Sequence, residues 1–491
     1  MNPREERSIV ETEEVKYVPK NVHNKPDTLF LYFTVLTGTS LTLTGSSGYA
    51  WPSSVLPHLL SNDTHANPLP APITTIEIST MTSLPILVGL LGCAAAPRLA
   101  LHLGKKRLLL LDGLAMLLSI VCTAFARSVS FMVICRCLFF LCHTGSVSIV
   151  PVYVTELCEN HNRAKFSSLA AVFMPVGQLM SYVMGPHLGY RAFTLASAAP
   201  LVVFLGLMGF TAETPEYLLA SGRRSECLDA LKRLRGNKEA KEIALDLEEI
   251  EGSLLEKKAG VGTGKIGVVA LLRNRNARLG IVLALVPAIL HHCCGDSAIS
   301  AFLGPIFQSA GTDISTGLAT AIVGVVRIFG LVISSFVVER RGRVFLLVSS
   351  ALGCALFYIL IGLYFYLKKT GAAIVHDVQW LPLVGVVGYV VAFSMGLGPL
   401  PNTIMGELFC TDLRPTAVSV ILAVVTVSLF GLNFLFPLIT EYAGMHFSMW
   451  MFAFNSLFGA VCVYLFLPET AGKSIAEIQS ALENYRIKLK R

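Results

Sequence analysis

Five polar side chains fall in stretches that are otherwise apolar, and they are the residues best placed to do chemistry. His291, His292, Asp296 and Ser297 belong to the string HHCCGDS, and Arg327 lies in the following apolar run. A charged side chain at membrane depth is costly and marks a functional site by default. We expect Asp296 and Arg327 to pair, either closing a binding site or recruiting a charged solute. In the alternative, Arg327 binds a backbone carbonyl and Asp296 faces water.

The histidines allow two interpretations. His292 and Asp296 are four residues apart and share a helical face, which would suit a proton relay because histidine titrates near neutral pH. Two polar residues lining an aqueous cavity explain the same pattern. Neighbouring helical residues point about 100° apart, so the string HHCC cannot gather around one zinc ion. With no nucleophile–base arrangement outside the apolar runs, we expect no enzyme activity, no metal and no cofactor.

The elements that must position these residues are membrane helices. The chain has 491 residues, of which 54% are hydrophobic and 14% charged, whereas soluble domains carry about 25% charged residues. Lipid cannot satisfy free backbone groups, so each apolar run of about 20 residues is predicted to be a helix. The expected spans are 29–50, 77–98, 108–126, 130–154, 166–186, 191–211, 278–303, 313–338, 344–367, 379–406, 416–439 and 446–467.

The distribution of charge predicts the orientation. The net charge of +7 would suit nucleic-acid binding, but the basic residues gather on one side of the predicted membrane, so we expect no nucleic-acid partner. With both termini cytoplasmic, only Arg127, Arg191, Lys368 and Lys369 fall outside, as the positive-inside rule requires. Trp51, Trp380 and Trp450 are predicted at outer helix ends, and Asn62 begins a glycosylation sequon in the outer loop 51–76.

Five segments follow from this topology. Residues 1–28 are expected to be a cytoplasmic tail and residues 29–211 a six-helix bundle. Residues 212–277 form a charged cytoplasmic linker with short amphipathic helices. Residues 278–467 form a second six-helix bundle, and residues 468–491 a cytoplasmic tail.

Three charged signatures occur once in each half, always on the predicted inner side. A basic Gly-containing turn follows the second and eighth spans, a Glu and Arg at equal spacing follow the fourth and tenth, and a Glu beside Thr and Pro follows the sixth and twelfth. Two parallel halves around a midplane site imply alternating access. We expect these charges to pair across the halves when the inner side closes: Lys105, Lys106, Glu156, Arg163, Glu213, Glu339, Arg340, Arg343, Glu407, Arg414 and Glu469.

These motifs carry a family resemblance from about residue 29 to 481. PVYVTE at 151–156, VVERRGR at 337–343, GLGPLP at 396–401 and LPETAGKSIAEIQ at 467–479 resemble the sugar porter family of the major facilitator superfamily. The opening GSSGYAWPSSVLPHL at 45–59 is similar to its insect branch of facilitated trehalose transporters. The resemblance implies twelve helices, a central cavity for a sugar and a location in the plasma membrane.

The departures from the family fall where its members touch sugar. The resemblance aligns a family Gln with Ala171, a family amide position with Arg327, and the tenth-span Trp with Asn402. Polar positions of the eleventh span align with Val425 and Leu429. Sugars are held by amide and hydroxyl hydrogen bonds and an aromatic face, so these losses should change recognition. The candidate substrate residues are His291, His292, Asp296, Ser297, Arg327 and Asn402.

Two further features concern motion and function. Gly396, Gly398, Pro399 and Pro401 loosen the tenth span and make it a predicted flexing element. The leading function is facilitative movement of trehalose or a hexose. The alternatives are a carrier for a different, charged or proton-coupled solute, and a transport-deficient sensor or scaffold on the same fold. The expected partners are a small solute and the bilayer.

Overall fold

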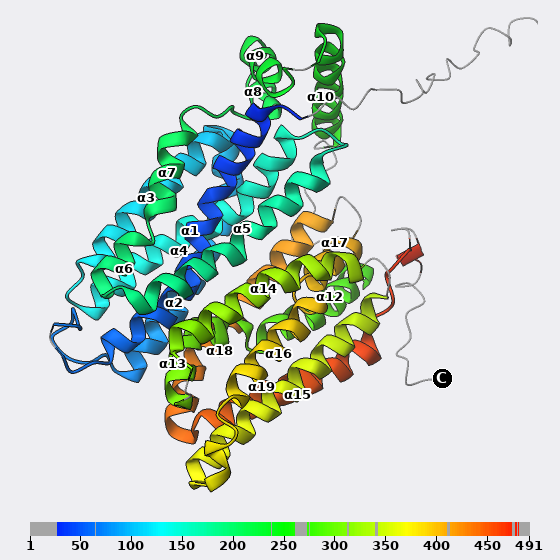
Figure 1. The fold of residues 1–491 in the computed structure, drawn as a ribbon. Coiled ribbons are helices and arrows are strands. Elements are labelled where there is room, and N and C mark those ends of the chain that lie inside the picture. Colours follow the sequence, from blue (N-terminus) through cyan, green and yellow to red (C-terminus); the bar gives the residue numbers. More distant parts are fainter. Residues whose placement is uncertain are drawn as a thin grey trace, which may run out of the picture.

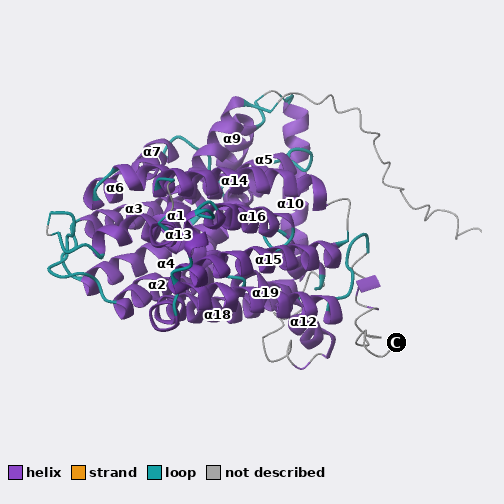
Figure 2. Cartoon of the chain, turned by 60° about the horizontal axis from the view of Figure 1, so that its bottom comes forward, coloured by secondary structure: helices purple, strands orange, loops and turns teal. Residues whose placement is uncertain are grey.

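The computed structural model describes residues 27–63, 65–236, 238–260, 273, 275–311, 314–338, 342–409, 413–473, 477–478 and 480. The structured elements in these ranges are all helices (Figure 2). Twelve of the helical stretches are long and apolar enough to cross a membrane. The expected all-α membrane architecture is therefore confirmed, and the chain is a multi-pass membrane protein.

The first six spans are built from α1 to α7. Their bounds are α1 Leu29–Leu59, α2 Thr75–Leu103, α3 Lys105–Ala124, α4 Val129–Leu157, α5 Arg163–Met184, α6 Tyr190–Ala196 and α7 Ala199–Met208. The last six are α12 Arg275–Cys293 with α13 Asp296–Ala310, α14 Thr316–Val338, α15 Arg343–Thr370, α16 Leu381–Met395 with α17 Leu400–Glu407, α18 Arg414–Ala443 and α19 Met445–Phe466. Between them lie α8 Pro215–Ala220, α9 Arg224–Leu234 and α10 Ala240–Gly260.

The helices form two bundles. Figure 1 shows α1–α7 in one bundle and α12–α19 in the other, with α8–α10 at one end of the first. We call that end of the molecule the linker end. The opposite end, which holds residues 60–63 and 65–74, is the loop end. The α1–α7 bundle is the N-half and the α12–α19 bundle the C-half.

Small residues let the helices of the N-half approach closely. A Cβ atom on Gly92 of α2 would lie 1.9 Å from the carbonyl oxygen of Leu141 on α4. The α2–α4 contact therefore requires glycine at this position. In a bilayer, such close packing replaces the hydrophobic drive that holds soluble helices together.

The end of the first span differs from the sequence-based expectation. α1 continues to Leu59, so the first loop is 60–74 rather than 51–76. Trp51 lies inside α1 and is 4% exposed, and its indole Nε1 donates to Thr194 Oγ1 at 3.1 Å. The prediction that Trp51 sits in an interfacial belt was wrong, because the indole fills a gap between α1 and α6. Trp380, at 52% exposure, lies at the loop end of the C-half as expected.

The hydrogen bonds that join the two halves in the described residues lie near the loop end. Ser53 Oγ of α1 accepts from the backbone N–H of Gly304 on α13 at 2.7 Å. Tyr182 of α5 donates through its hydroxyl to the Ser300 carbonyl at 2.9 Å and accepts through its own carbonyl from Thr320 Oγ1 at 3.4 Å. The halves are thus fastened at the end away from the linker.

The linker is held to the N-half by a buried charge cluster. Arg235, 7% exposed, follows α9 and lies 2.8 Å from the Glu159 carboxylate in the α4–α5 turn. Its guanidinium also contacts Asp246 of α10 and donates to the Leu157 carbonyl. Lys238 pairs with the same two carboxylates. The linker helices therefore move with the linker end of α4.

The pKa values of the two carboxylates in this cluster, Glu159 and Asp246, are shifted in opposite directions. Burial raises the pKa of Glu159, but the hydrogen bond from Lys238 and the charge of Arg235 outweigh it and lower the pKa overall. Burial raises the pKa of Asp246, and the charges of Lys238 and Arg235 do not offset it. The ionised Glu159 thus stabilises the folded linker, whereas ionised Asp246 carries a burial penalty.

We predict that Glu159→Gln releases the linker and that Asp246→Asn does so much less. The loss for Glu159→Gln should be about 1.5–3 kcal/mol, because Arg235 keeps its contact with Asp246 but loses the nearer carboxylate. Since the folded pKa of Glu159 is lowered, its contribution is present above the unfolded pKa of about 4.5 and disappears as the pH falls through the folded value. Limited trypsin digestion of residues 212–260 measures release; equal cleavage of both variants would contradict the assignment.

Candidate functional site

The seventh span is broken where its polar string lies. α12 ends at Cys293 and α13 begins at Asp296, with Gly295 between them in a left-handed conformation at φ +92°. A Cβ atom on Gly295 would lie 2.8 Å from the Phe452 ring, so conformation and space both require glycine. The break places Asp296 in the first turn of α13, where the positive end of the helix dipole favours a carboxylate.

The tenth span is broken as well. α16 ends at Met395 and α17 begins at Leu400, so the Gly–Pro segment, which was predicted to loosen this span, interrupts the helix; its flexing stays a prediction. The His291 Nδ1 lies 2.5 Å from the carbonyl oxygen of Leu397 in this second break. With Nδ1 donating to that carbonyl, Nε2 of His291 is left as a hydrogen-bond acceptor. His291 thus joins the two discontinuous spans at their breaks.

Asp296 and Arg327 form the ion pair that the sequence predicted. The Arg327 Nη2 donates to Asp296 Oδ1 at 2.8 Å and Nη1 donates to Oδ2 at 3.2 Å. The Tyr389 hydroxyl of α16 donates to Asp296 Oδ1 at 2.9 Å, and Arg327 Nη2 also donates to Ser300 Oγ at 3.2 Å. Both charged side chains are largely buried, at 19% and 14% exposure. The bidentate pair fixes α13 against α14, and the Tyr389 hydrogen bond fixes α13 against α16.

The remaining candidate substrate residues are placed differently. Ser297 exchanges hydrogen bonds with Asn433 of α18, whose Nδ2 lies 3.3 Å from Ser297 Oγ. His292 is half-buried with its ring against that of His291. Asn402 is exposed on α17. The broken seventh span and α14 therefore bring together His291, His292, Asp296, Ser297 and Arg327. Asn402 is not part of this group and lies on α17, after the break in the tenth span.

Sequence reasoning missed three polar residues. Asn433 is 1% exposed and lies one turn beyond Leu429, the position that the family alignment indicated. Tyr389 contacts Asp296 from α16, but a tyrosine in an apolar run carries no distinctive signal. Asp112, on α3, accepts from Ser146 Oγ at 3.0 Å; as a carboxylate within a predicted span, it should have been selected by the rule that selected Asp296.

The charged signatures of the N-half form one cluster at the linker end. The Lys105 Nζ lies 2.6 Å from the Glu156 carboxylate. Glu213 accepts from the backbone N–H of Lys106 at 3.1 Å and so caps α3. The Lys106 Nζ donates to the carbonyls of Gly209 and Thr211. Gly104 directly precedes α3, and its φ of +88° lets the chain reverse direction against Glu213.

The C-half repeats this cluster. Arg343 Nη2 donates to Glu407 at 2.9 Å, and Glu469 accepts from the backbone N–H of Arg343 at 2.8 Å, capping α15. Thr470 Oγ1 donates to Glu407 at 2.7 Å. The correspondence is residue for residue: a base that starts a helix, a glutamate that pairs with it, and a second glutamate that caps the helix.

Glu156 and Glu407 are therefore each paired with a basic residue of their own half in this conformation. Arg163 is exposed at the start of α5, and Arg414 donates to the Phe409 carbonyl at 3.2 Å. Glu339 and Arg340 lie outside the described residues. The exchange of these charges across the two halves in another conformation stays a prediction.

Comparison with known proteins decides the family. Residues 27–482 match the family model described as "Sugar (and other) transporter". The chain belongs to this sugar transporter family. Across 471 residues it is 30% identical to the facilitated trehalose transporter Tret1 of Anopheles gambiae, covering 95% of this chain and 58% of that protein. It is also 30% identical to Tret1 of Culex quinquefasciatus, covering 80% of this chain and 75% of that one.

A solved structure supports the fold. The sugar transporter family member described here superposes on the inward-open xylose transporter XylE of E. coli with a TM-score of 0.75 and 21% identity, covering 92% of this chain and 99% of that one. The two-bundle fold of this chain is thus the fold of that xylose transporter. The family and these relatives are transporters.

We predict that Asp296 and Arg327 are energetically coupled. Asp296→Asn or Arg327→Gln alone should each destabilise the protein by about 3–5 kcal/mol, because each leaves its partner charged and unpaired at membrane depth. The double variant should recover most of that loss. Thermal unfolding in detergent and surface expression measure the effect.

The matched control is the exposed pair Arg223 and Glu226 in the linker. Removing either exposed charge alone should leave the stability nearly unchanged, because solvent screens this pair. If the Asp296/Arg327 double variant is no better tolerated than the single variants, the two residues are not acting as a pair.

Proposed function

We propose that this chain carries a sugar, trehalose or a hexose, across the plasma membrane by exposing one site alternately to the two sides. The observation that carries the proposal is the contact between the two broken spans, His291 to Leu397. Interrupted helices at membrane depth occur where backbone lines a protein-enclosed binding site. The chain spans 58% of the length of the Anopheles relative. The proposed activity therefore rests on the residues of this chain as well as on the similarity.

The chemistry around the breaks suits a neutral polyol. Imidazole, amide and hydroxyl groups at His291, Ser297 and Asn433 can exchange hydrogen bonds with sugar hydroxyls. The charge of Arg327 is already matched by Asp296, so the site has no net charge that would call for an ionic solute.

The same contacts favour a facilitative carrier over a proton-coupled one. Both carboxylate oxygens of Asp296 already accept hydrogen bonds, from Arg327 and Tyr389. A carboxylate held in this way is a poor proton carrier for a relay with His292. A facilitative mechanism requires only that sugar binding lower the barrier between the two conformations.

The orientation belongs to the proposal too. We place both termini and the linker in the cytoplasm, because the basic residues gather at the linker end. Asn62 is exposed in the loop at the other end, and Thr64 of its sequon lies outside the described residues. Expression in insect cells should give a glycosylated band that shifts with endoglycosidase and is lost in Asn62→Gln. A band shift that appears only when a sequon is introduced into the linker would reverse the orientation.

Uptake of labelled trehalose and glucose in oocytes tests the activity. We expect saturable uptake that is unchanged by an imposed proton gradient. His291→Leu removes the bridge between the broken spans and should reduce uptake at least about tenfold, the equivalent of about 1.4 kcal/mol. His102→Leu, at the exposed end of α2, is the matched control and should leave uptake unchanged.

The alternatives give different results. Uptake that requires the proton gradient would identify a proton-coupled carrier and contradict the facilitative mechanism. Normal surface expression without uptake of either sugar would contradict the sugar assignment and support a transport-deficient sensor on the same fold.

A further inference from the structure

Arg136 is the second arginine at membrane depth, and its surroundings differ from those of Arg327. It lies on α4, is 5% exposed, and donates to the carbonyls of Met81 at 3.4 Å and Gly48 at 3.3 Å. Both distances exceed the usual 2.7–3.2 Å for such bonds. In the described part of the chain, none of the ion pairs includes Arg136.

Aromatic rings stabilise the guanidinium without neutralising it. Its central carbon lies 4.6 Å from the centre of the Trp51 ring and 5.5 Å from that of Phe140. Ring faces attract a cation through their quadrupole, but they carry no net charge. An isolated buried charge is costly unless it is paired. In the same chain Arg327 receives a carboxylate, whereas Arg136 receives carbonyls and rings.

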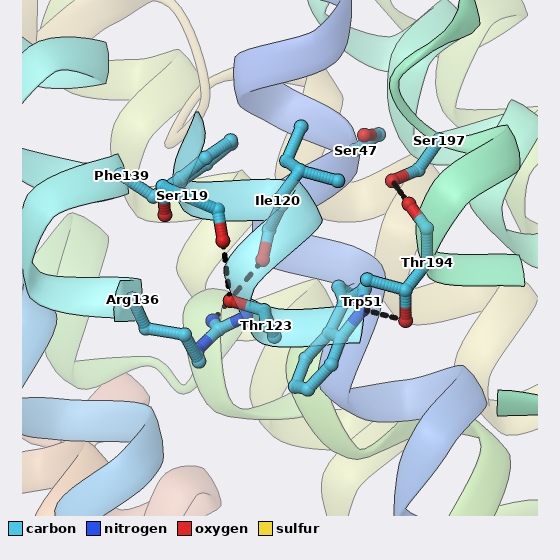
Figure 3. A pocket seen from close by; sticks show the side chains of 10 residues that line it. Ser47, Trp51, Ser119, Ile120, Thr123, Arg136, Phe139, Thr194 and Ser197 are labelled. Atoms are coloured by element: carbon cyan, nitrogen blue, oxygen red, sulfur yellow. Dashed lines mark hydrogen bonds between the residues drawn. The ribbon is translucent and has the colours of Figure 1, made fainter. Parts of the chain in front are cut away.

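A small cavity lies beside the Arg136 guanidinium. Figure 3 shows the guanidinium and the Trp51 indole among serine and threonine side chains of α1, α3 and α6. The cavity has a volume of about 30 Å³, which is room for one or two particles the size of a water molecule. The hydroxyls that line it are those of Ser47, Ser119, Thr123, Thr194 and Ser197.

The hydrogen bonds of these hydroxyls decide what the cavity can hold. The Ser119 hydroxyl donates across to the Cys135 carbonyl of α4. The other four, of Ser47, Thr123, Thr194 and Ser197, donate to carbonyls three or four residues earlier in their own segments. Such local bonds can be exchanged by rotation about one side-chain bond. Arg136 supplies the positive charge and those N–H donors that are not used by the carbonyls of Met81 and Gly48. Water would fill the space but leave the charge uncompensated, whereas a small anion would neutralise it.

We propose that the cavity beside Arg136 binds a single monovalent halide, chloride under physiological conditions. The ion bridges the guanidinium and the hydroxyls of α1, α3 and α6 and completes the charge balance of the N-half. The site is distinct from the broken spans of the C-half. Trp51 in its lining lies on α1 two residues before Ser53, which bonds to Gly304 across the halves, so occupancy of the site should stabilise the loop end.

Thermal unfolding of the purified full chain tests the site. At constant ionic strength, replacing gluconate by chloride should raise the melting temperature along a saturating curve. In Arg136→Gln the chloride-dependent rise should vanish, whereas Arg191→Gln, an exposed arginine at the loop end, should retain it in full. Equal melting temperatures of the native chain in chloride and gluconate, or an undiminished chloride effect in Arg136→Gln, would overturn the proposal.

A fluorescence measurement remains decisive if Arg136→Gln does not fold. The double variant Trp380→Phe/Trp450→Phe leaves Trp51, whose ring faces the cavity, as the sole indole. Iodide bound beside Arg136 should quench it saturably, and chloride should compete and restore the emission. Quenching that is strictly linear in iodide concentration and unaffected by chloride would show that only water occupies the cavity and would overturn the proposal.

Discussion

The absence of water from the bilayer interior is the constraint on which the rest of the structure depends. A charge or a free backbone group in hydrocarbon must find its partner within the protein. Arg327 finds Asp296, and the Leu397 carbonyl, freed by a helix break, finds His291. These contacts allow two helices to be interrupted at membrane depth. The interruptions in turn bring imidazole, amide and hydroxyl groups to one place, which an unbroken helix would spread along its length.

The same constraint separates the moving parts from the fixed ones. At the linker end, each half binds its own charges into a compact cluster, around Glu156 in one and Glu407 in the other. The halves are therefore internally stiff at that end, and the hydrogen bonds between them in the described ranges lie near the loop end. Two stiff bundles joined through a small set of hydrogen bonds can rock against each other without unfolding, because each bundle keeps its own core and its own charge pairs.

Much of this architecture was predictable because its causes are local. Apolar runs fix the spans, and repeated motifs fix the two-half plan. The Asp296–Arg327 pair followed from the cost of an isolated charge. Other features depend on packing between distant segments, which a single sequence does not reveal: Trp51 fills a gap beside α6 instead of the interface, and Asn433 reaches Ser297 from a helix over a hundred residues away. Likewise, Glu156 pairs with Lys105 of its own half in this conformation, and the sequence alone does not determine which conformation is observed.

The central claim is that the two halves rotate as units about a shared site, so that one end opens as the other closes. Pulsed electron–electron double resonance measures this directly. The native cysteines are replaced, and spin labels are attached to cysteines introduced in pairs. One spin-label pair is placed at the linker end, on Ala164 and Phe345, and one at the loop end, on Leu60 and Gln308; all four positions are exposed. Saturating trehalose or glucose should shift the two distance distributions in opposite directions. Distributions that both stay fixed, or that both lengthen or both shorten, would contradict the account.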